Sequence, residues 1–267
     1  MNLIKNKTKK TLFNDSSGSF YFIKRIIVFI VGFYTYRRYN GFNELKISGT
    51  ENLEGLPKTN VMFVSNHQTY FADVIAMYHV FNSFKNGFKN TIKDPVYLLN
   101  PMLDFYYVAA SETMKEGIIQ KIFTYCGAVT IKRSWRAAGV DVDRGVDSSG
   151  IESIKHALNN GWLVNFPQGT TKPFVPGRKG VAHMIKDLKP IVVPIVIDGF
   201  RRAYDKKGMF IKKKGIVQKI TIKPSLVIDY ENESINDILE KVMDSIEQSQ
   251  KFMKVPEINP IENKNQE

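Results

Sequence analysis

The chain has 267 residues, of which 43% are apolar and 24% are charged, as is usual for a globular protein. This balance excludes a chain that is disordered throughout and a chain that lies entirely within a membrane. The formal net charge of +12 predicts a negatively charged partner, such as nucleic acid, anionic lipid or a phosphorylated substrate.

The first part of the chain is typical of a segment that associates with membranes. Residues 1–50 hold nine Lys or Arg but only two acidic residues. The eleven mostly apolar residues 26–36 lie between two basic pairs; as a helix they would span roughly 16 Å, whereas a bilayer core needs about 30 Å. Such a helix is too short to cross, and Tyr34 and Tyr36 favour a position in the headgroup layer. We expect residues 1–44 to form this basic, membrane-associating segment; the alternative is a helix buried against the domain.

Strand-like and helix-like segments alternate in the rest of the chain. The expected strands are residues 61–64, 106–109, 128–132, 162–166, 191–197 and 219–229. The expected helices are residues 72–84, 114–125, 150–159, 180–188 and 235–252. This alternation predicts one α/β domain over residues 45–254. Residues 134–149, rich in Gly, Asp and Ser, predict a mobile loop near the site, and residues 255–267 a flexible tail.

The cysteine and histidine content argues against metal chemistry. Cys126 is the only cysteine, which excludes an intrachain disulfide and a cysteine-based metal cluster and favours a reducing compartment. No paired histidine spacing and no carboxylate cluster occurs, so we expect neither a metal site nor a bound cofactor, and we expect His79, His156 and His183 to be structural. No helix-turn-helix, RNA-binding aromatic signature or zinc pattern is visible, so nucleic acid is not the expected partner.

Polar residues follow three of the expected strands. Residues 65–69 (SNHQT) follow the first strand, Lys132 and Arg133 end the strand that begins at residue 128, and residues 167–171 (PQGTT) follow the strand that begins at residue 162. In α/β sheets, the loops at the carboxyl ends of the strands form the binding crevice. We therefore expect a histidine, an arginine and a Gly-Thr turn to meet at one site.

Four short motifs, in this order, resemble those of the glycerolphosphate and lysophosphatidic acid acyltransferase family. Asn66-His67 with the later Asp73 resembles the catalytic His-Asp motif. Residues 127–133 (GAVTIKR) resemble the second motif, whose arginine binds the acceptor phosphate. Residues 166–170 (FPQGT) resemble the third, normally Phe-Pro-Glu-Gly-Thr-Arg, and residues 192–196 (VVPIV) resemble the fourth, a strand with a proline.

Three positions depart from the family pattern. His67 and Asp73 are separated by five residues where the family typically has four, which leaves open whether the aspartate orients the histidine. Gln168 replaces the usual glutamate and Thr171 replaces the usual arginine, which leaves the phosphate contacts open. Nearby cations are candidates to supply the missing charge: Lys172, Arg178 and Lys179. The departures indicate either a different acceptor lipid or a loss of activity.

The resemblance implies a central mixed sheet flanked by helices and an O-acyltransferase activity. His67 would deprotonate the hydroxyl of a lyso-lipid, Asp73 would orient the imidazole, and the hydroxyl would attack a thioester of acyl carrier protein or coenzyme A. The acceptor expected first is 1-acylglycerol-3-phosphate, which would give phosphatidic acid; the alternatives are a lyso-aminolipid, and an inactive basic protein that binds membrane surfaces. The chain would act at the cytoplasmic face of the cell membrane as a peripheral or monotopic protein.

The same resemblance, with the cations nearby, implies a set of residues that bind the substrates. Guanidinium groups bind phosphate or carboxylate in a bidentate manner, and backbone N–H groups of a tight turn at a helix entrance can face an anion. The expected substrate-binding residues are Asn66, Lys132, Arg133, Gln168, Gly169, Thr170, Thr171, Arg178 and Lys179.

Overall fold

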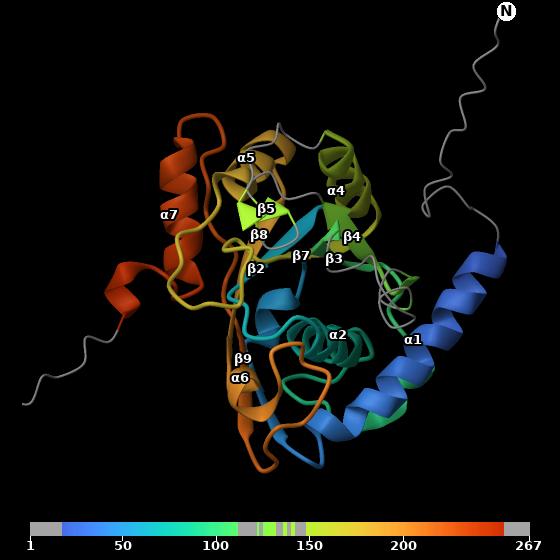
Figure 1. The fold of residues 1–267 in the computed structure, drawn as a ribbon. Helices are drawn as coiled ribbons and strands as arrows, with labels where there is room; N and C mark the ends of the chain where they lie inside the picture. Colours follow the sequence, from blue (N-terminus) through green and yellow to red (C-terminus); the bar gives the residue numbers. More distant parts are fainter. Residues whose placement is uncertain are drawn as a thin grey trace, which may run out of the picture.

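A twisted sheet with helices on both faces forms the body of the protein (Figure 1). The structure, a computed structural model, describes residues 18–111, 122, 125–131, 136–137, 140–141 and 148–253. Within this part of the chain, seven strands form the main sheet in the order β1-β9-β8-β2-β7-β3-β4. They are β1 (Glu44–Ser48), β2 (Val61–Ser65), β3 (Phe105–Ala110), β4 (Ala128–Ile131), β7 (Trp162–Asn165), β8 (Ile191–Asp198) and β9 (Val217–Ile222).

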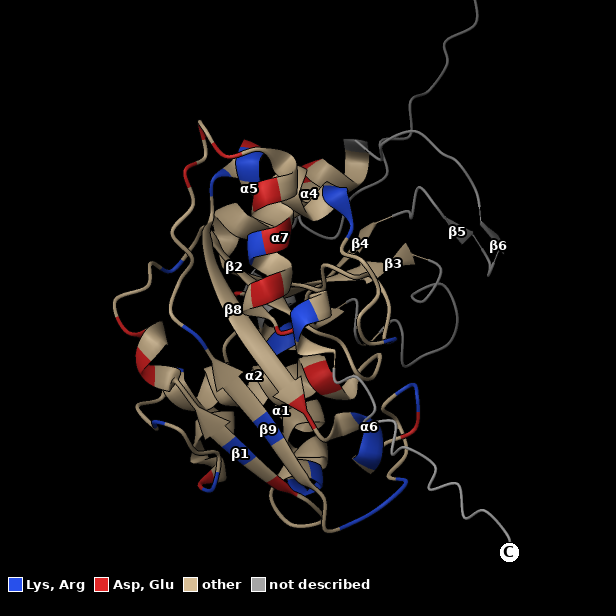
Figure 2. Ribbon diagram, turned by 90° about the vertical axis from the view of Figure 1, so that its left-hand side faces the viewer, with Lys and Arg blue, Asp and Glu red and all other residues tan. Residues whose placement is uncertain are grey.

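The sheet is mixed, as expected. Strands β8, β2, β7, β3 and β4 are parallel to one another, whereas β9 is antiparallel to β8 and β1 is parallel to β9. Figure 2 shows β1, β9 and β8 side by side at one end of the sheet. All residues of β2 are buried, as is typical of a central parallel strand that is covered on both faces. Because the five parallel strands run the same way, their carboxyl ends meet at one edge.

Two hydrophobic cores lie on opposite faces of the sheet. Helices α1 (Gly18–Tyr39) and α2 (Ala72–Lys85) cover one face, and helices α4 (Ser148–Asn160), α5 (Lys179–Leu188) and α7 (Ile235–Ser245) cover the other. Met62 and Phe63 point into different cores because successive side chains of a strand alternate between its faces. The predicted α/β fold, with a central mixed sheet flanked by helices, is confirmed.

The strand predicted for residues 219–229 was wrong beyond Ile222, where β9 ends. Pro224 has no backbone N–H and cannot continue a ladder. The chain nevertheless follows β8 further, since Lys223 N donates to Pro194 O at 2.9 Å and Leu226 N donates to Val192 O at 2.8 Å.

The helix predicted for residues 235–252 was also too long. Helix α7 ends at Ser245, and Glu247 adopts a left-handed backbone conformation with φ 59°, which a right-handed helix cannot accommodate. A separate 3-10 turn follows at Gln250–Phe252. Strand β1 and the short helix α6 (Phe200–Ala203) were not predicted.

Some predicted segments fall largely outside the described residues. The predicted helix at residues 114–125 and the tail at residues 255–267 belong to these. Of the predicted loop at residues 134–149, the short strands β5 (Arg136–Ala137) and β6 (Val140–Asp141) are described and pair antiparallel, and its last two residues begin α4.

Helix α1 buries both polar and apolar side chains against the domain and exposes a row of large apolar side chains on its other face. Lys24 Nζ donates to Leu103 O at 2.6 Å, and Arg38 Nη2 donates to Gly208 O at 2.8 Å. The opposite face exposes large apolar side chains, with Phe33 at 68% and Tyr34 at 81% exposure. The complete set is Phe22, Ile23, Ile26, Phe29, Ile30, Phe33 and Tyr34. No helix among the described residues is long and apolar enough to cross a membrane.

A buried histidine joins α1 to α2. His79 of α2 is completely buried; its Nε2 lies 2.9 Å from Thr35 Oγ1 of α1, and its Nδ1 lies 2.8 Å from the Tyr97 hydroxyl in the 3-10 turn η2 (Pro95–Leu99). Burial lowers the pKa of His79 to about 3. The neutral imidazole therefore acts as a structural connector between the two helices.

Acidification should destabilise the fold through His79. An unfolded histidine titrates near 6.5, so between this value and about 3 the unfolded chain binds a proton that the folded chain does not. The free energy of unfolding should therefore fall as the pH is lowered, and this group should contribute a loss of about 2 kcal/mol between pH 7 and pH 5. Urea unfolding of the wild type and of His79→Gln at both pH values measures that contribution.

The stability of His79→Gln should depend less steeply on pH than that of the wild type, although the variant should be less stable at pH 7 because two buried hydrogen bonds are altered. The variant His183→Gln, which changes an exposed histidine, serves as the control and should keep the wild-type dependence. An identical pH dependence in the wild type and in His79→Gln would contradict the assignment.

Candidate active site

His67 and Asp73 form a hydrogen-bonded pair at the carboxyl edge of the sheet. His67 lies in the loop that follows β2, and Asp73 lies in the first turn of α2. The Nδ1 atom of His67 is 3.0 Å from Oδ2 of Asp73. The extra residue in the spacing therefore does not separate the two side chains. Asp73 is completely buried, whereas the His67 side chain keeps 13% exposure and can be reached from solvent.

The loop surrounds the Asp73 carboxylate with donors. The backbone N–H groups of Gln68 and Thr69 donate to Oδ2, and the hydroxyl of Thr69 donates to Oδ1 at 2.6 Å. These donors, together with His67, compensate the charge of a carboxylate that has no contact with water. A carboxylate only accepts hydrogen bonds, so the proton of the neutral imidazole lies on Nδ1.

The other ring nitrogen of His67 is available for chemistry. With the proton on Nδ1, Nε2 carries a lone pair, and no described residue forms a hydrogen bond with it. The ring of Phe166, which follows β7, stacks on the imidazole with 3.9 Å between the centroids and 23° between the planes. The carboxylate and the aromatic ring together set both the tautomer and the plane of the base.

Two amide side chains on either side of His67 fix its loop to the end of β8. Asn66 Nδ2 donates to Ile197 O at 2.9 Å, and Asn66 Oδ1 accepts from Ile197 N at 2.8 Å. Gln68 Nε2 donates to the same carbonyl at 3.1 Å, and Gln68 Oε1 accepts from Arg201 N at 3.1 Å. Both polar atoms of the Asn66 amide thus bind the backbone of β8, and they hold the loop of His67 in position.

The Gly-Thr turn is present, but it does not open a helix. Gly169 has φ 62°, and its N–H donates to Phe166 O at 2.9 Å, which closes a tight turn. The expectation that this turn stands at a helix entrance was wrong, because α5 begins only at Lys179. Pro173 and Pro176 lie between them and disfavour helical backbone in the residues before them. Thr170 Oγ1 accepts from Lys172 N at 3.2 Å.

Gln168 holds this loop together from inside. Its side chain is 1% exposed, and Nε2 donates to Val175 O at 2.9 Å and to Gln248 Oε1 at 3.3 Å. The same Gln248 oxygen accepts from Phe174 N at 3.0 Å. Arg178 N donates to Pro167 O at 2.9 Å and closes the loop. The structure therefore gives Gln168 a scaffolding position beneath the loop.

Four further residues were predicted to bind the substrates. Thr171 is buried, and its carbonyl accepts from Arg201 Nη2, while Lys179 is exposed at the start of α5. Lys132 and Arg133 lie outside the described residues. They follow β4, whose carboxyl end lies at the same edge as that of β2. No cluster of metal-binding side chains occurs among the residues that the structure describes.

Comparison with known proteins assigns the chain to a family. A family model described as Acyltransferase matches residues 44–198, more than half of the chain. The chain belongs to the acyltransferase family. Its matched region contains both members of the His67–Asp73 pair, the loop of Gln168 and the whole of β8.

Two known acyltransferases show the extent of the similarity. A 1-acyl-sn-glycerol-3-phosphate acyltransferase from Cocos nucifera is 31% identical over 122 residues, which cover 41% of this chain and 39% of that protein. Among solved structures, the 1-acyl-sn-glycerophosphate (LPA) acyltransferase PlsC from Thermotoga maritima has a TM-score of 0.49 and 18% identity, covering 85% of this chain and 90% of that one.

The motifs of this acyltransferase did not reveal three contributors to the site. Thr69 and Gln68 bind the aspartate and fix the loop, and Phe166 stacks on the histidine. Asp73 lies in the first turn of α2, and Thr69 lies four residues before it. This spacing could have indicated that the hydroxyl of Thr69 donates to the Asp73 carboxylate. The partner of Gln68 lies more than a hundred residues away in the sequence, so no local pattern could indicate it.

Replacing Gln168 with the glutamate that is usual in the family motif should destabilise this protein. The carboxylate would be buried against Val175 O and Gln248 Oε1, both of which are acceptors, so two hydrogen bonds would become repulsive contacts. We expect Gln168→Glu to lower the free energy of unfolding by about 2 kcal/mol at neutral pH. Urea unfolding measures this loss, and Gln250→Glu, at an exposed position, should cost almost nothing. Equal stability of both variants would contradict the scaffolding position of Gln168.

Proposed function

We propose that this acyltransferase moves a fatty acyl group from a thioester of acyl carrier protein or coenzyme A to the free hydroxyl of a lyso-lipid. The proposed acceptor is 1-acylglycerol-3-phosphate, and the product is phosphatidic acid. The observation that supports this most strongly is the His67–Asp73 pair with its open Nε2, in a chain of the acyltransferase family. The choice of acceptor is supported by the substrate in the name of the Cocos nucifera relative.

The proposed reaction needs one base and no covalent enzyme intermediate. Nε2 of His67 takes the proton from the lipid hydroxyl while the oxygen attacks the thioester carbonyl. The imidazolium that forms is stabilised by Asp73, 3.0 Å from Nδ1. When the tetrahedral intermediate collapses, the carbon–sulfur bond breaks and the proton passes to the leaving thiolate. The products are an ester and a free thiol, and the histidine returns to its neutral form.

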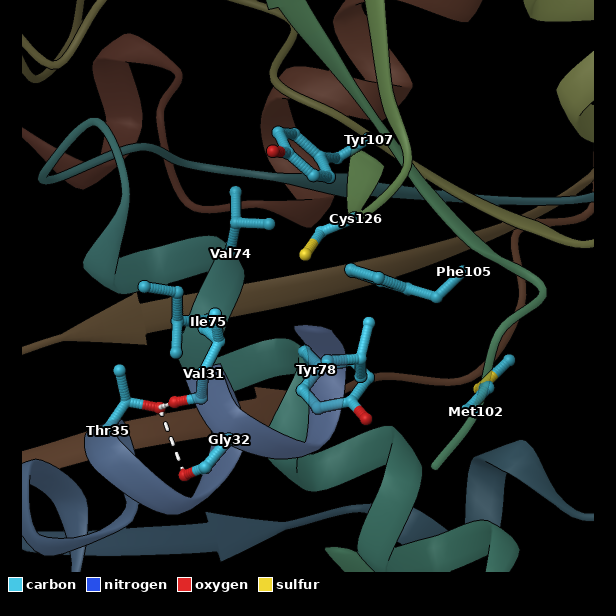
Figure 3. A pocket seen from close by; sticks show the side chains of 11 residues that line it. Val31, Gly32, Thr35, Val74, Ile75, Tyr78, Met102, Phe105, Tyr107 and Cys126 are labelled. Atoms are coloured by element: carbon cyan, nitrogen blue, oxygen red, sulfur yellow. Dashed lines mark hydrogen bonds between the residues drawn. The ribbon is translucent and has the colours of Figure 1, made fainter. Parts of the chain in front are cut away.

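An apolar pocket beside the pair supports a fatty acyl substrate. Residues of α1, α2 and β3 line it, including Val74, which follows Asp73, and Tyr107 and Cys126 point toward it (Figure 3). The space between its lining residues is about 440 Å³ when the part open to solvent is included, and the lining is mainly apolar. Burial raises the pKa of the Cys126 thiol to about 11, so this thiol stays protonated and is no nucleophile at neutral pH.

Removal of the imidazole should abolish acyl transfer without unfolding the protein. We expect His67→Ala to lower kcat/KM by about 100- to 10,000-fold, the usual contribution of a general base. Formation of labelled phosphatidic acid from labelled thioester and 1-acylglycerol-3-phosphate measures it, with a lyso-aminolipid as the second acceptor. His183→Ala, which changes an exposed histidine, is the matched control and should keep the wild-type rate. Full transfer by His67→Ala would contradict the mechanism, and a wild type that acylates only the lyso-aminolipid would replace the proposed acceptor.

We also propose that α1 attaches the protein to the cytoplasmic face of the cell membrane. Large apolar side chains cover its outward face, and Arg25 and Arg37 of the same helix are exposed. An apolar stripe with flanking cations fits a helix that lies in the headgroup layer of an anionic bilayer. The inward face of α1 already buries Val28 and Tyr39 against the domain, so the exposed apolar side chains are additional surface that a lipid layer can cover.

Polar substitutions on the outward face of α1 should weaken membrane binding. We expect Ile30→Asn combined with Phe33→Ser to lower the partition onto anionic vesicles by about tenfold or more, because two exposed side chains lose their burial in lipid. Vesicle sedimentation measures the partition. The control Val227→Ser changes an even more exposed apolar residue after β9 and should bind as the wild type does. Unchanged binding of the double variant would contradict the proposed role of α1.

A further inference from the structure

Arg201 lies at the junction of the two loops that carry the candidate active site. It belongs to α6, which directly follows β8, and it lies beyond the residues that the family model matches. Its backbone N–H donates to Gln68 Oε1, next to His67. Its guanidinium reaches the other loop and donates from Nη2 to the carbonyl of Thr171. The side chain is therefore held between the loop of the base and the loop of Gly169.

The charge of Arg201 has no acidic partner among the described residues. None of their ion pairs includes it, and no hydrogen bond to a described residue is made by its Nε or Nη1. Arg202, the next residue, differs completely, because both of its terminal nitrogens bind the Asp198 carboxylate, at 3.2 and 2.9 Å. Two adjacent exposed arginines thus differ: within the described part of the chain, Arg202 is paired with a carboxylate, whereas Nε and Nη1 of Arg201 have no hydrogen-bond partner.

The surroundings of Arg201 are positive as well. Figure 2 marks basic residues on α6 and on the loop after it. This loop is bound directly to the loop of the base, since Tyr70 N donates to Lys206 O at 3.1 Å and Phe71 N donates to Lys207 O at 3.0 Å. An uncompensated guanidinium in such a field favours an anionic ligand, and its planar edge suits a phosphate or a carboxylate.

We infer that Arg201 binds the anionic headgroup of the acceptor lipid, a phosphate monoester or a carboxylate, and thereby positions the acceptor hydroxyl at Nε2 of His67. This inference rests on the proposed function. In 1-acylglycerol-3-phosphate, the hydroxyl and the phosphate are on adjacent carbons, so the group that binds the phosphate must lie close to the base. Arg201 fits this requirement because its backbone N–H is bound to Gln68, the residue after His67, and its guanidinium is bound to Thr171 O in the loop of Gly169.

The adjacent arginines allow a matched test of this role. Binding and steady-state kinetics are measured for Arg201→Gln, Arg201→Lys and Arg202→Gln with three acceptors: 1-acylglycerol-3-phosphate, a lyso-aminolipid with a free carboxylate, and uncharged monoacylglycerol. We expect Arg201→Gln to weaken binding and raise KM of an anionic acceptor by about tenfold or more, without changing KM for the thioester or binding of monoacylglycerol. Arg201→Lys should keep part of the affinity for the anionic acceptor that Arg201→Gln loses. Arg202→Gln should change the affinity and the KM of that acceptor by less than about threefold.

The outcomes separate this inference from the proposed function. Wild-type affinity in Arg201→Gln, or an equal loss in Arg202→Gln, would overturn the role of Arg201 while leaving acyl transfer intact. If the wild type transfers no acyl group, the proposed function is overturned. If that wild type still binds an anionic lyso-lipid more tightly than Arg201→Gln does, the anion site is supported. The acceptor with the larger loss identifies the headgroup as phosphate or carboxylate. Thermal unfolding verifies that each variant is folded, which we expect because the bond to Gln68 is made by the backbone of Arg201 and the substitutions alter a single hydrogen bond of its side chain, to Thr171 O.

Discussion

The candidate site depends on one buried charge, the carboxylate of Asp73. A carboxylate without access to water is stable only if donors surround it, and the loop from His67 to Thr69 supplies them from two backbone N–H groups, a hydroxyl and the imidazole. The same contacts that satisfy this charge force the loop into a single shape. The same hydrogen bonds therefore position the base and stabilise the buried carboxylate. This explains why His67 and Asp73 are in contact although one more residue separates them than in the family pattern.

The sheet supplies the second constraint. Parallel strands end at a common edge, so the loops after β2, β7 and β8 meet although they are far apart in the chain. Amide side chains then join them: Asn66 and Gln68 bind the end of β8, and Gln168 binds the loop after β7 from below. An amide both donates and accepts, so it can continue the hydrogen-bonding pattern of a strand beyond the last residue of the sheet. Through Gln68 the backbone N–H of Arg201 is bound to the loop that carries the base.

Helix α1 is apolar on its outward face as well as on part of its inward face. Lys24, Thr35 and Arg38 face the domain and form hydrogen bonds there, while aromatic and aliphatic side chains face outward. Burying polar groups is tolerable only because each finds a partner, and the outward surface remains unsatisfied in water. An exposed apolar face of this size is typical of a surface that contacts a partner or a lipid layer.

The amino-acid sequence by itself determined the α/β architecture and the family, because these depend on local periodicity and on short motifs. It named His67 and Asp73 as candidates but left their contact open, and the structure shows that contact. The sequence also indicated where most strands begin, although Pro224 and Glu247 ended two elements earlier than the apolar pattern suggested. Only the tertiary structure decided that Gln168 lies beneath its loop, that Asn66 binds a strand, and that Arg201 rather than Arg202 has an uncompensated charge. The reason is physical: hydrogen-bond partners and screening charges are set by neighbours in space, and across a parallel sheet these neighbours come from segments that are distant in the chain.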